Sequence, residues 1–303
     1  MMTGVGALVA RNLLLFLRDR MAVFFSLLSA LILVLLYTLF LGELQISNLR
    51  EAFPTASRTE IAAFIDAWMF AGIVAMTATT TGLGALGVLV DDAARGRSRD
   101  LLIAPVPTGA IVLGYLLSAV VVTLAMTFGV LALSLSYLWL ADGLTLSISS
   151  VLRVAGAVLV ISIAFTALAA LVTSFVSSPG AYAALSTIVG TVLGFLTGAY
   201  IPVGSFPEPV QDTVTVLPFA QAALLLRQEF ASAPLHAVTA DRPAAESPLR
   251  VYFGLDAAIA GHPVAPPVII AVLIGLAIVC TLLSTIRMRG RLGRRHVEGG
   301  KNA

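Results

Sequence analysis

The sequence has few charged residues. Of its 303 residues, 59% are hydrophobic and only 11% are charged, whereas a soluble domain carries roughly 25% charged residues. A chain with so little charge cannot cover a soluble surface. We therefore predict an integral membrane protein, with membrane lipid as its surroundings and no nucleic-acid partner.

Residues for metal or nucleophilic chemistry are also scarce. Cys280 is the single cysteine, which excludes a disulfide framework and a cysteine metal site. The histidines lie far apart in the chain, and we expect no metal site from them. The sequence has no GxxxxGK[ST] phosphate loop, no GxSxG elbow and no HExxH pair. We therefore expect no enzymatic activity and no cofactor in this chain.

Long apolar runs are abundant. A membrane-spanning helix needs about 20 apolar residues, and six runs reach that length. They are Met21–Gly42, Ala67–Val90, Thr108–Leu140, Val154–Val176, Gly180–Ile201 and Val264–Ile286. Backbone groups in lipid must be hydrogen-bonded within the segment, so we predict six transmembrane helices in an all-α fold. The third run is long for one span, and we expect its first turns, Thr108–Tyr115, to tilt or to lie at the interface.

None of the six runs contains a charged residue or a histidine. Ion-coupled transporters usually keep such residues inside their spans, where they mark the coupling path. The energy for any transport by this chain is therefore expected to come from outside its spans.

The positions of the charges indicate the orientation. Six spans place both termini on one side, together with the charged loop 91–107. That side has the excess of Lys and Arg, which marks the cytoplasm. We predict a multi-pass protein of the cell membrane, with a basic cytoplasmic tail at 287–303. Trp68, Trp139, Tyr37 and Tyr200 fall at the outer ends, as expected of an interfacial aromatic belt.

Residues 1–20 precede the first span. Arg11 and Arg18 are seven residues apart and share one helical face. This pattern predicts a helix lying in the membrane interface with its arginines toward the lipid headgroups. The alternative is an extension of the first span. The apolar run that follows is longer than the core of a signal peptide, and we interpret it as a retained span.

The outer connections are unequal in length. The loop Glu43–Asp66 could carry a short helix around Arg58–Ile65. The outer segment 202–263 is the longest, and its part around Asp241–Pro248 resembles an irregular, solvated linker. Within this segment, Ser205 and Glu208 fit a capping box. The prolines predict a helix to about Val216 and a second helix from Pro218 to Leu226, a hairpin that dips toward the bilayer. Alternatively, these prolines only punctuate a surface loop.

Two stretches together resemble the type-2 ABC transporter permeases. The first is Gly198-x3-Pro202-x3-Phe206-Pro207 with Leu217-Pro218 and Leu225-x-Arg227. The second is the loop with Asp92, Gly96, Asp100-Leu101-Leu102 and Ala104-Pro105-Val106. The order of these motifs and the six spans agree with that family over most of the chain. Thr108 and Tyr115 differ from it, because the family often has basic residues there.

The resemblance implies a mechanism and a set of partners. Two permease subunits, identical or paralogous, would pair with two ATPase subunits, which hold the ATP and Mg²⁺. The loop would form a coupling helix that docks on the ATPase. In that helix, the polar contacts with the ATPase would be Arg97, Arg99 and Asp100, and the apolar contacts would be Leu101 and Leu102. Arg95 and Pro105 would belong to the same coupling site. Alternatively, the arginines only set the topology. The outer hairpin would be re-entrant, with Pro202, Phe206, Pro207, Glu208, Pro218 and Arg227 as its marker residues.

Small and hydroxyl residues indicate two further sites. Gly190, Gly194 and Gly198 repeat at a spacing of four and allow close helix packing. This packing could be within one subunit or, as the resemblance favours, across a dimer. Thr77, Thr80 and Thr81 could line a pathway, although such hydroxyls more often bond back to helix carbonyls.

These observations predict a single transmembrane permease domain over 1–303. We expect the membrane subunit of an ATP-driven ABC exporter for a hydrophobic or amphipathic compound, such as a drug, an antibiotic or a lipid-like molecule. One alternative is an ABC exporter of a lipid-linked polysaccharide. Another, from a different class, is a secondary transporter or channel that does not use ATP.

Overall fold

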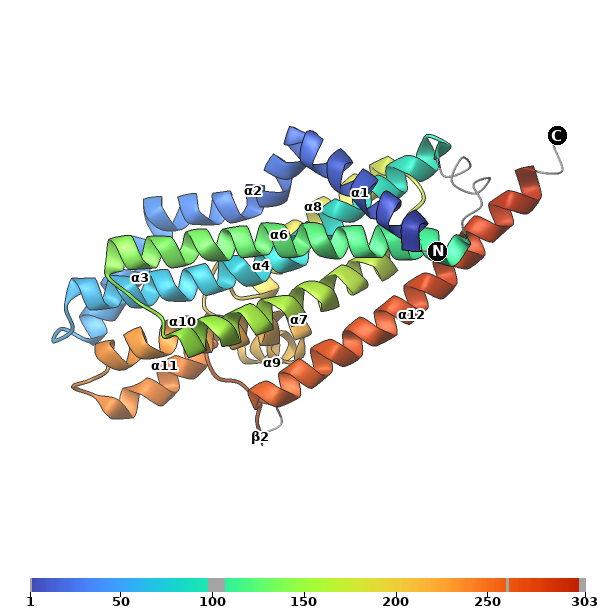
Figure 1. Cartoon of the computed structure of the whole chain (residues 1–303). Coiled ribbons are helices and arrows are strands. Elements are labelled where there is room, and N and C mark those ends of the chain that lie inside the picture. Colours follow the sequence, from blue (N-terminus) through green and yellow to red (C-terminus); the bar gives the residue numbers. More distant parts are fainter. Residues whose placement is uncertain (1, 98–106, 260–261, 300–303) are drawn as a thin grey trace.

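The chain folds into an elongated bundle of helices (Figure 1). The computed structural model describes residues 2–97, 107–259 and 262–299. The helices of the first half are α1 (Met2–Arg18), α2 (Arg20–Leu36), a π-helical turn η1 (Tyr37–Leu41), α3 (Gly42–Ala52), α4 (Arg58–Ala94) and α6 (Thr108–Asp142). Then follow α7 (Ile148–Thr173), α8 (Pro179–Leu196), a 3₁₀ turn η2 (Val203–Ser205), α9 (Glu208–Val216), α10 (Pro218–Val238), a 3₁₀ turn η3 (Pro243–Ala245), α11 (Glu246–Tyr252) and α12 (Pro266–Gly299). Strand β1 (Ala258–Ile259) pairs antiparallel with β2 (His262–Pro263).

Six helical segments in the described part of the chain are long and apolar enough to cross a membrane. They are Ala30–Ala52, Arg58–Ala94, Gly109–Asp142, Ile148–Thr173, Pro179–Leu196 and Pro266–Gly290. Each overlaps one of the apolar runs in the sequence, so the prediction of a six-helix membrane protein is confirmed.

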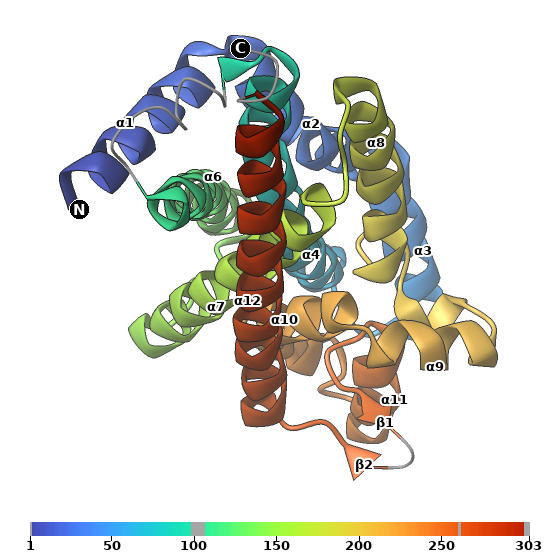
Figure 2. The same cartoon turned by 90° about the vertical axis from the view of Figure 1, so that its right-hand side faces the viewer.

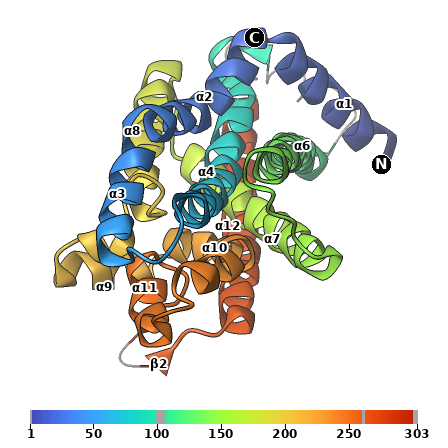
Figure 3. The same ribbon diagram turned by 90° about the vertical axis from the view of Figure 1, so that its left-hand side faces the viewer.

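The two ends of the bundle differ in their elements. Helix α1 lies at the same end as the C-terminal ends of α4 and α12 (Figures 1 and 2). We call this the basic end, because the arginines at 11, 95, 97, 287 and 289 lie on these elements or directly after them. Helix α10 packs along α4, and α9 and α11 lie beside α10, away from α1 (Figures 1 and 3). We call that end the distal end.

Helix α4 is the central helix of the bundle, and it packs against α2, α3, α6, α7, α8 and α10 (Figure 3). It begins earlier than the apolar run predicted. Ser57 Oγ accepts a hydrogen bond from Glu60 N, and Glu60 Oε2 accepts one from Ser57 N at 2.8 Å, which forms a capping box at its start. Residues 58–65 are helical, as predicted, but they do not form a short helix of an outer loop. They are the first turns of α4 and bury Ile61, Phe64 and Ile65.

The first turns of α6 do not lie free at an interface. Ile111 and Tyr115 are buried, and with Leu8 of α1 they form a small apolar cluster. At Gly114, an added Cβ would come within 2.9 Å of Leu8 Cβ, so glycine allows α1 to lie close on α6. Helix α1 thus covers the extra length of the third apolar run.

Residues 200–263, which we call the distal segment, contain more helix than the sequence suggested. Helix α9 ends at Val216 and α10 begins at Pro218, as predicted. Helix α10 continues to Val238, well beyond the predicted Leu226. The predicted capping box of α9 is wrong, because its N-cap is Pro207 and has no side-chain hydrogen bond, whereas Ser205 lies in η2 and bonds Tyr252.

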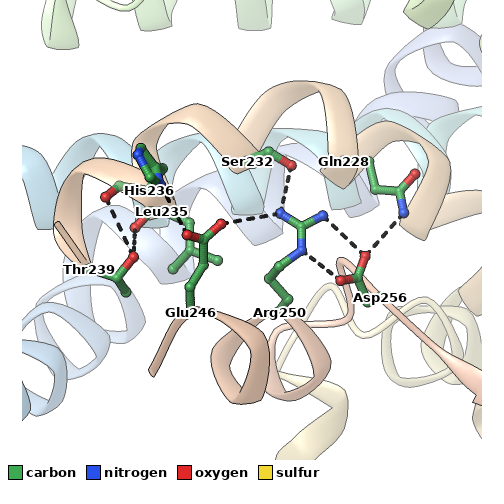
Figure 4. Close-up of polar contacts among 8 residues, drawn as sticks. All are labelled: Gln228, Ser232, Leu235, His236, Thr239, Glu246, Arg250 and Asp256. Carbon is green, nitrogen blue, oxygen red and sulfur yellow. Dashed lines mark hydrogen bonds and ion pairs between the residues drawn. The ribbon is translucent and has the colours of Figure 1, made fainter. Parts of the chain in front are cut away.

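The segment around Asp241–Pro248 is largely exposed, as predicted, but it is not irregular, since η3 and the start of α11 occupy it. Figure 4 shows the polar contacts that hold α11 against α10. His236 Nδ1 of α10 lies 3.0 Å from Glu246 Oε2 of α11. Arg250 of α11 donates to Asp256 at 2.6 and 3.1 Å and to Ser232 of α10 at 3.1 Å. The Arg250 guanidinium holds the pKa of Asp256 below its usual range.

Two members of the expected aromatic belt lie inside the protein instead. Trp68 is fully buried and donates from Nε1 to Phe253 O at 2.7 Å. Tyr37, in the π-helical turn, is 3% exposed and donates to Tyr200 O at 3.3 Å. Trp139, in contrast, is 61% exposed. Trp68 and Tyr37 therefore join α4 and the first span to the distal segment.

The close contact of α4 with α7 gives a testable prediction. An added Cβ at Gly82 would lie 2.7 Å from Thr166 Oγ1 and 3.0 Å from Thr166 Cα. We expect Gly82→Val to lower the free energy of unfolding by about 1–3 kcal/mol, because overpacking forces the two helices apart. The control is Gly156→Val, since nothing lies within 4 Å of that position. Thermal unfolding of the detergent-purified protein measures both; equal melting temperatures for the two variants would contradict this packing.

Candidate functional site

The functional candidate with the most specific geometry is a buried carboxylate at the basic end. Asp92 lies in the last turn of α4, and its side chain is 1% exposed. A buried charge is costly unless it is paired and hydrogen-bonded. The residues around Asp92 are therefore expected to supply hydrogen bonds and a positive charge to its carboxylate.

Three side chains approach this carboxylate. Arg11 donates from Nη1 to Asp92 Oδ2 at 2.8 Å and from Nη2 to Oδ1 at 3.1 Å. Such a two-bond arginine–carboxylate pair is strong and directional. The Tyr115 hydroxyl donates to Oδ2 at 2.6 Å, and Arg97 Nη1 lies 3.5 Å from Oδ1. The hydrogen bond to Asp92 raises the pKa of Arg11.

This cluster joins three helices and the start of the connection that follows α4. Arg11 comes from α1, Asp92 from α4 and Tyr115 from α6. The next residue of α1, Asn12, is buried and donates to Ser118 Oγ of α6 at 3.1 Å. We call Arg11, Asn12, Asp92, Arg97, Tyr115 and Ser118 the Asp92 anchor. Arg11 was predicted to face lipid headgroups; its side chain instead turns to Asp92 and is 31% exposed.

The predicted coupling residues are described only in part. Helix α4 continues through Asp91 and Asp92 to Ala94, so the loop is shorter than 91–107. Arg95 and Asp91 are exposed and 3.9 Å apart, whereas Arg97 reaches the anchor. Arg99, Asp100, Leu101, Leu102 and Pro105 lie outside the described residues, and their contact with an ATPase stays a prediction.

Two arginines of α12 contact other elements at the basic end. The guanidinium of Arg287 lies over the ring of Phe175, 3.8 Å from its centroid, next to the α7–α8 turn. The guanidinium of Arg289 packs against Gly109, at the start of α6. The basic residues at this end therefore have packing roles in addition to any effect on topology.

The predicted re-entrant residues lie together at the distal end. Pro202 precedes η2 and is buried, and Phe206 packs against a cluster of Val203, Val214 and Ala220. The other markers of this segment are Pro207 and Glu208 at the start of α9, Pro218 as the first residue of α10, and Arg227 in the middle of α10.

Arg227 is 1% exposed. It donates from Nη2 to Gly198 O at 2.7 Å, and its guanidinium carbon lies 5.0 Å from the centroid of the Trp68 ring. Gly198 and Gly254 have positive φ angles of 64° and 67°, and an added Cβ at either would come within 3.3 or 3.1 Å of Nη1. Arg227 therefore joins the end of α8, the start of α4 and the turn after α11.

The sequence of the chain matches the family model of ABC-2 type transporters over residues 3–230. The chain belongs to the ABC-2 type transporter family. It is thus a membrane subunit of an ABC transporter, and its partner is a separate ATPase subunit. A comparison with curated proteins finds no match.

The match extends from α1 to the middle of α10. In this ABC-2 chain it covers the whole Asp92 anchor and Arg227, whereas α11, β1, β2 and α12 lie beyond it. The family resemblance read from the sequence is confirmed.

The glycine stripe of this ABC-2 subunit is not one continuous open face. At Gly194 the ring of Tyr200 fills the space of a Cβ, and Gly198 lies beyond the end of α8 beside Arg227. Only Gly190 of the three faces open space. Gly194 and Gly198 therefore pack within the chain, and a role in a dimer stays a prediction for Gly190.

The threonines of α4 follow the alternative that the sequence left open. Thr77 donates to Ile73 O at 2.8 Å and Thr80 to Met76 O at 3.0 Å, each four residues earlier. Thr81 is fully buried, and its hydroxyl has no partner among the described residues. A role in a pathway stays a prediction for these residues.

Sequence reasoning missed the Asp92 anchor as a cluster. Arg11 and Asp92 are 81 residues apart in the chain, and no local spacing relates them. One signal was present, because Arg11 lies among apolar residues of α1 and needs either water or an acid. Asp92 at the end of a long apolar run was the acid available.

The anchor predicts a specific pattern of stability effects. Asp92→Asn leaves Arg11 without its partner, and we expect a loss of about 3 kcal/mol in unfolding free energy. Arg11→Met should cost a similar amount, and the double variant should cost less than the sum, because the two residues share one interaction. Chemical denaturation in detergent micelles measures this cycle.

The matched control is the neighbouring residue. Asp91→Asn removes an exposed carboxylate at 3.9 Å from Arg95, so it should change stability by less than about 0.5 kcal/mol. Additive effects of the Arg11 and Asp92 substitutions, or equal effects at positions 91 and 92, would contradict the anchor.

Proposed function

We propose that this chain is the permease subunit of an ATP-driven exporter, which moves a hydrophobic or amphipathic compound out of the cell. The family membership supports the transporter class, and the six apolar runs, which contain no charged residue, support an apolar cargo rather than an ion. Two such subunits, identical or paralogous, would pair with two ATPase subunits that hold ATP and Mg²⁺. In this proposal the basic end faces the cytoplasm.

The observation that carries the mechanism is the position of the Asp92 anchor. It lies where the proposed coupling segment leaves α4, and Arg97 of that segment is in contact with Asp92 at 3.5 Å. A displacement of the segment by an ATPase would therefore reach a carboxylate that is held at the same time by α1 and α6. The three helices would then move as one unit.

Helix α4 is suited to carry such a displacement to the distal end. It is one continuous helix of 37 residues, and at its other end Trp68 bonds the turn after α11. A helix rises 1.5 Å per residue, so α4 has the length to connect both membrane surfaces. The proposal thus links the ATPase side to the distal segment through one helix.

The proposed cargo and the proposed dimer both concern the exposed apolar faces. Helix α8 is the least covered of the six spans, and it exposes Ile188, Val192 and Phe195 besides Gly190. Such an apolar face could contact a second subunit or lipid. An amphipathic cargo could lie between two subunits that meet at this face.

The test of the function is reconstitution with an ATPase. The chain is co-expressed with an ABC ATPase that co-purifies with it, and the purified complex is placed in lipid vesicles. We expect ATP hydrolysis to be stimulated by hydrophobic compounds and ATP-dependent movement of such a compound across the bilayer. Transport that persists in vesicles without any ATPase would contradict the proposal and support an ATP-independent transporter.

The coupling step gives a separate prediction. Arg97→Glu places a second acid beside Asp92, and we expect it to lower substrate-stimulated ATP hydrolysis about five-fold or more, as for a coupling energy of about 1 kcal/mol. The matched control is Arg58→Glu, which reverses an exposed arginine at the distal end. The melting temperature and the amount of bound ATPase are measured in parallel. Unchanged stimulation in Arg97→Glu would contradict the proposed route through the anchor.

A further inference from the structure

A second buried charge, at the distal end, has no acidic partner. Arg227 is 1% exposed, and no described carboxylate lies within ion-pair distance of it. Its Nε is buried and has no hydrogen-bond partner among the described residues. Burial lowers the pKa of Arg227 to about 10, which still leaves the side chain cationic at neutral pH. A buried cation without a counter-charge is unfavourable in free energy.

Beside Arg227 lies a cavity of about 130 Å³. Its wall comes from α9 and α10 on one side and from the segment after α11 on the other. The polar residues that line it are Gln211, Asp212, Thr215, Gln221, Arg227 and Asp256. A water molecule takes up about 30 Å³ in the liquid, so the cavity has room for a group as large as a carboxylate or a phosphate.

The other charges at the cavity do not neutralise Arg227. Asp256 is already bound by Arg250 at 2.6 and 3.1 Å and by Gln228 at 3.2 Å, as Figure 4 shows. Asp212 is exposed at the surface of α9 and has no ion pair among the described residues. The two glutamine amides donate to backbone carbonyls, Gln211 to Phe206 O at 2.6 Å and Gln221 to Val216 O at 3.2 Å. The guanidinium is thus the one cation on the wall whose charge is unbalanced within the described chain.

We propose that this cavity binds an anionic group of carboxylate or phosphate size, with Arg227 as the residue that holds it. The ligand supplies the counter-charge that the protein lacks. It could be a free anion from solution or the acidic headgroup of a lipid or amphipathic molecule, since both present the same chemistry. This proposal does not depend on the direction of transport or on the ATPase.

The experiment measures binding to the full chain in detergent. Inorganic phosphate and acetate are titrated against the protein, and the melting temperature and the heat of binding are recorded, with sodium chloride at equal ionic strength as the salt control. We expect saturable binding and a rise in melting temperature that follows the occupied fraction. Asp212→Asn removes a negative charge that repels an anion in the cavity, so it should lower the dissociation constant about three-fold or more.

Two further variants separate the site from the fold. Arg227→Met should abolish binding but is at risk of misfolding, because Arg227 also bonds Gly198 O. Ala257→Leu fills the cavity from its wall and leaves Arg227 in place, so it should weaken binding at least ten-fold at an unchanged melting temperature of the anion-free protein. Conversely, loss of stability in Asp212→Asn without any anion binding would identify Asp212 as the counter-ion and overturn the proposal.

The lipid arm distinguishes the two sources of the anion. The protein is placed in nanodiscs of phosphatidylglycerol or of phosphatidylcholine. If a headgroup occupies the cavity, phosphatidylglycerol raises the melting temperature, and free phosphate adds nothing further. If a free anion occupies it, phosphate stabilises the protein equally in both. No anion effect in either lipid, or an effect unchanged by Ala257→Leu, would overturn the proposal.

Discussion

The fold depends on how the chain compensates one carboxylate. Asp92 ends the central helix, where its side chain has almost no contact with water. Removing a charge from water costs several kcal/mol, and only good hydrogen-bond geometry recovers this cost. Arg11 supplies two hydrogen bonds and Tyr115 a third. Helix α1 therefore cannot leave the bundle without stranding a buried charge, and α1, α4 and α6 are fixed to one another at the point where the connection begins.

The sequence predicted the spans well, because lipid imposes one solution on any long apolar run. It could not predict what lies between residues distant in the chain. Arg11 was expected at the headgroups because its local pattern is that of an interfacial helix, and only the fold brings Asp92 to it. Trp68 was expected at the surface for the same reason, but α10 and the turn after α11 cover it. The hydropathy pattern of one segment indicates whether the segment lies in lipid or in water. It does not indicate which distant residues its side chains contact.

The distal segment shows where hydropathy gives too little information. Helix α10 contains Gln221, Arg227 and Gln228, so it does not resemble a membrane span, and its second half was interpreted as part of a loop. The segment is nevertheless largely buried, with Leu224, Leu226 and Phe230 in the core. Gln221 and Arg227 donate to backbone carbonyls and Gln228 donates to Asp256, whereas Arg227 Nε has no partner among the described residues. Burial against protein tolerates polar residues that burial against lipid does not, and this is why the extent of α10 had to come from the structure.

Among the described residues, Asp92 and Arg227 are the charged side chains that are buried, and their surroundings differ. At the basic end, an acid meets an arginine and a tyrosine from other helices, and the group is complete within the chain. At the distal end, Arg227 has a carbonyl, an aromatic face and three nearby glycines, but no carboxylate. A pair complete in itself fixes helices in place, whereas an unbalanced charge beside a cavity favours a ligand of opposite sign. The first arrangement suits the transmission of movement, and the second suits recognition at the opposite membrane surface. Helix α4 contacts both, with Asp92 at one end and Trp68 near the other, so an anion held by Arg227 would bear on the same helix that the anchor fixes.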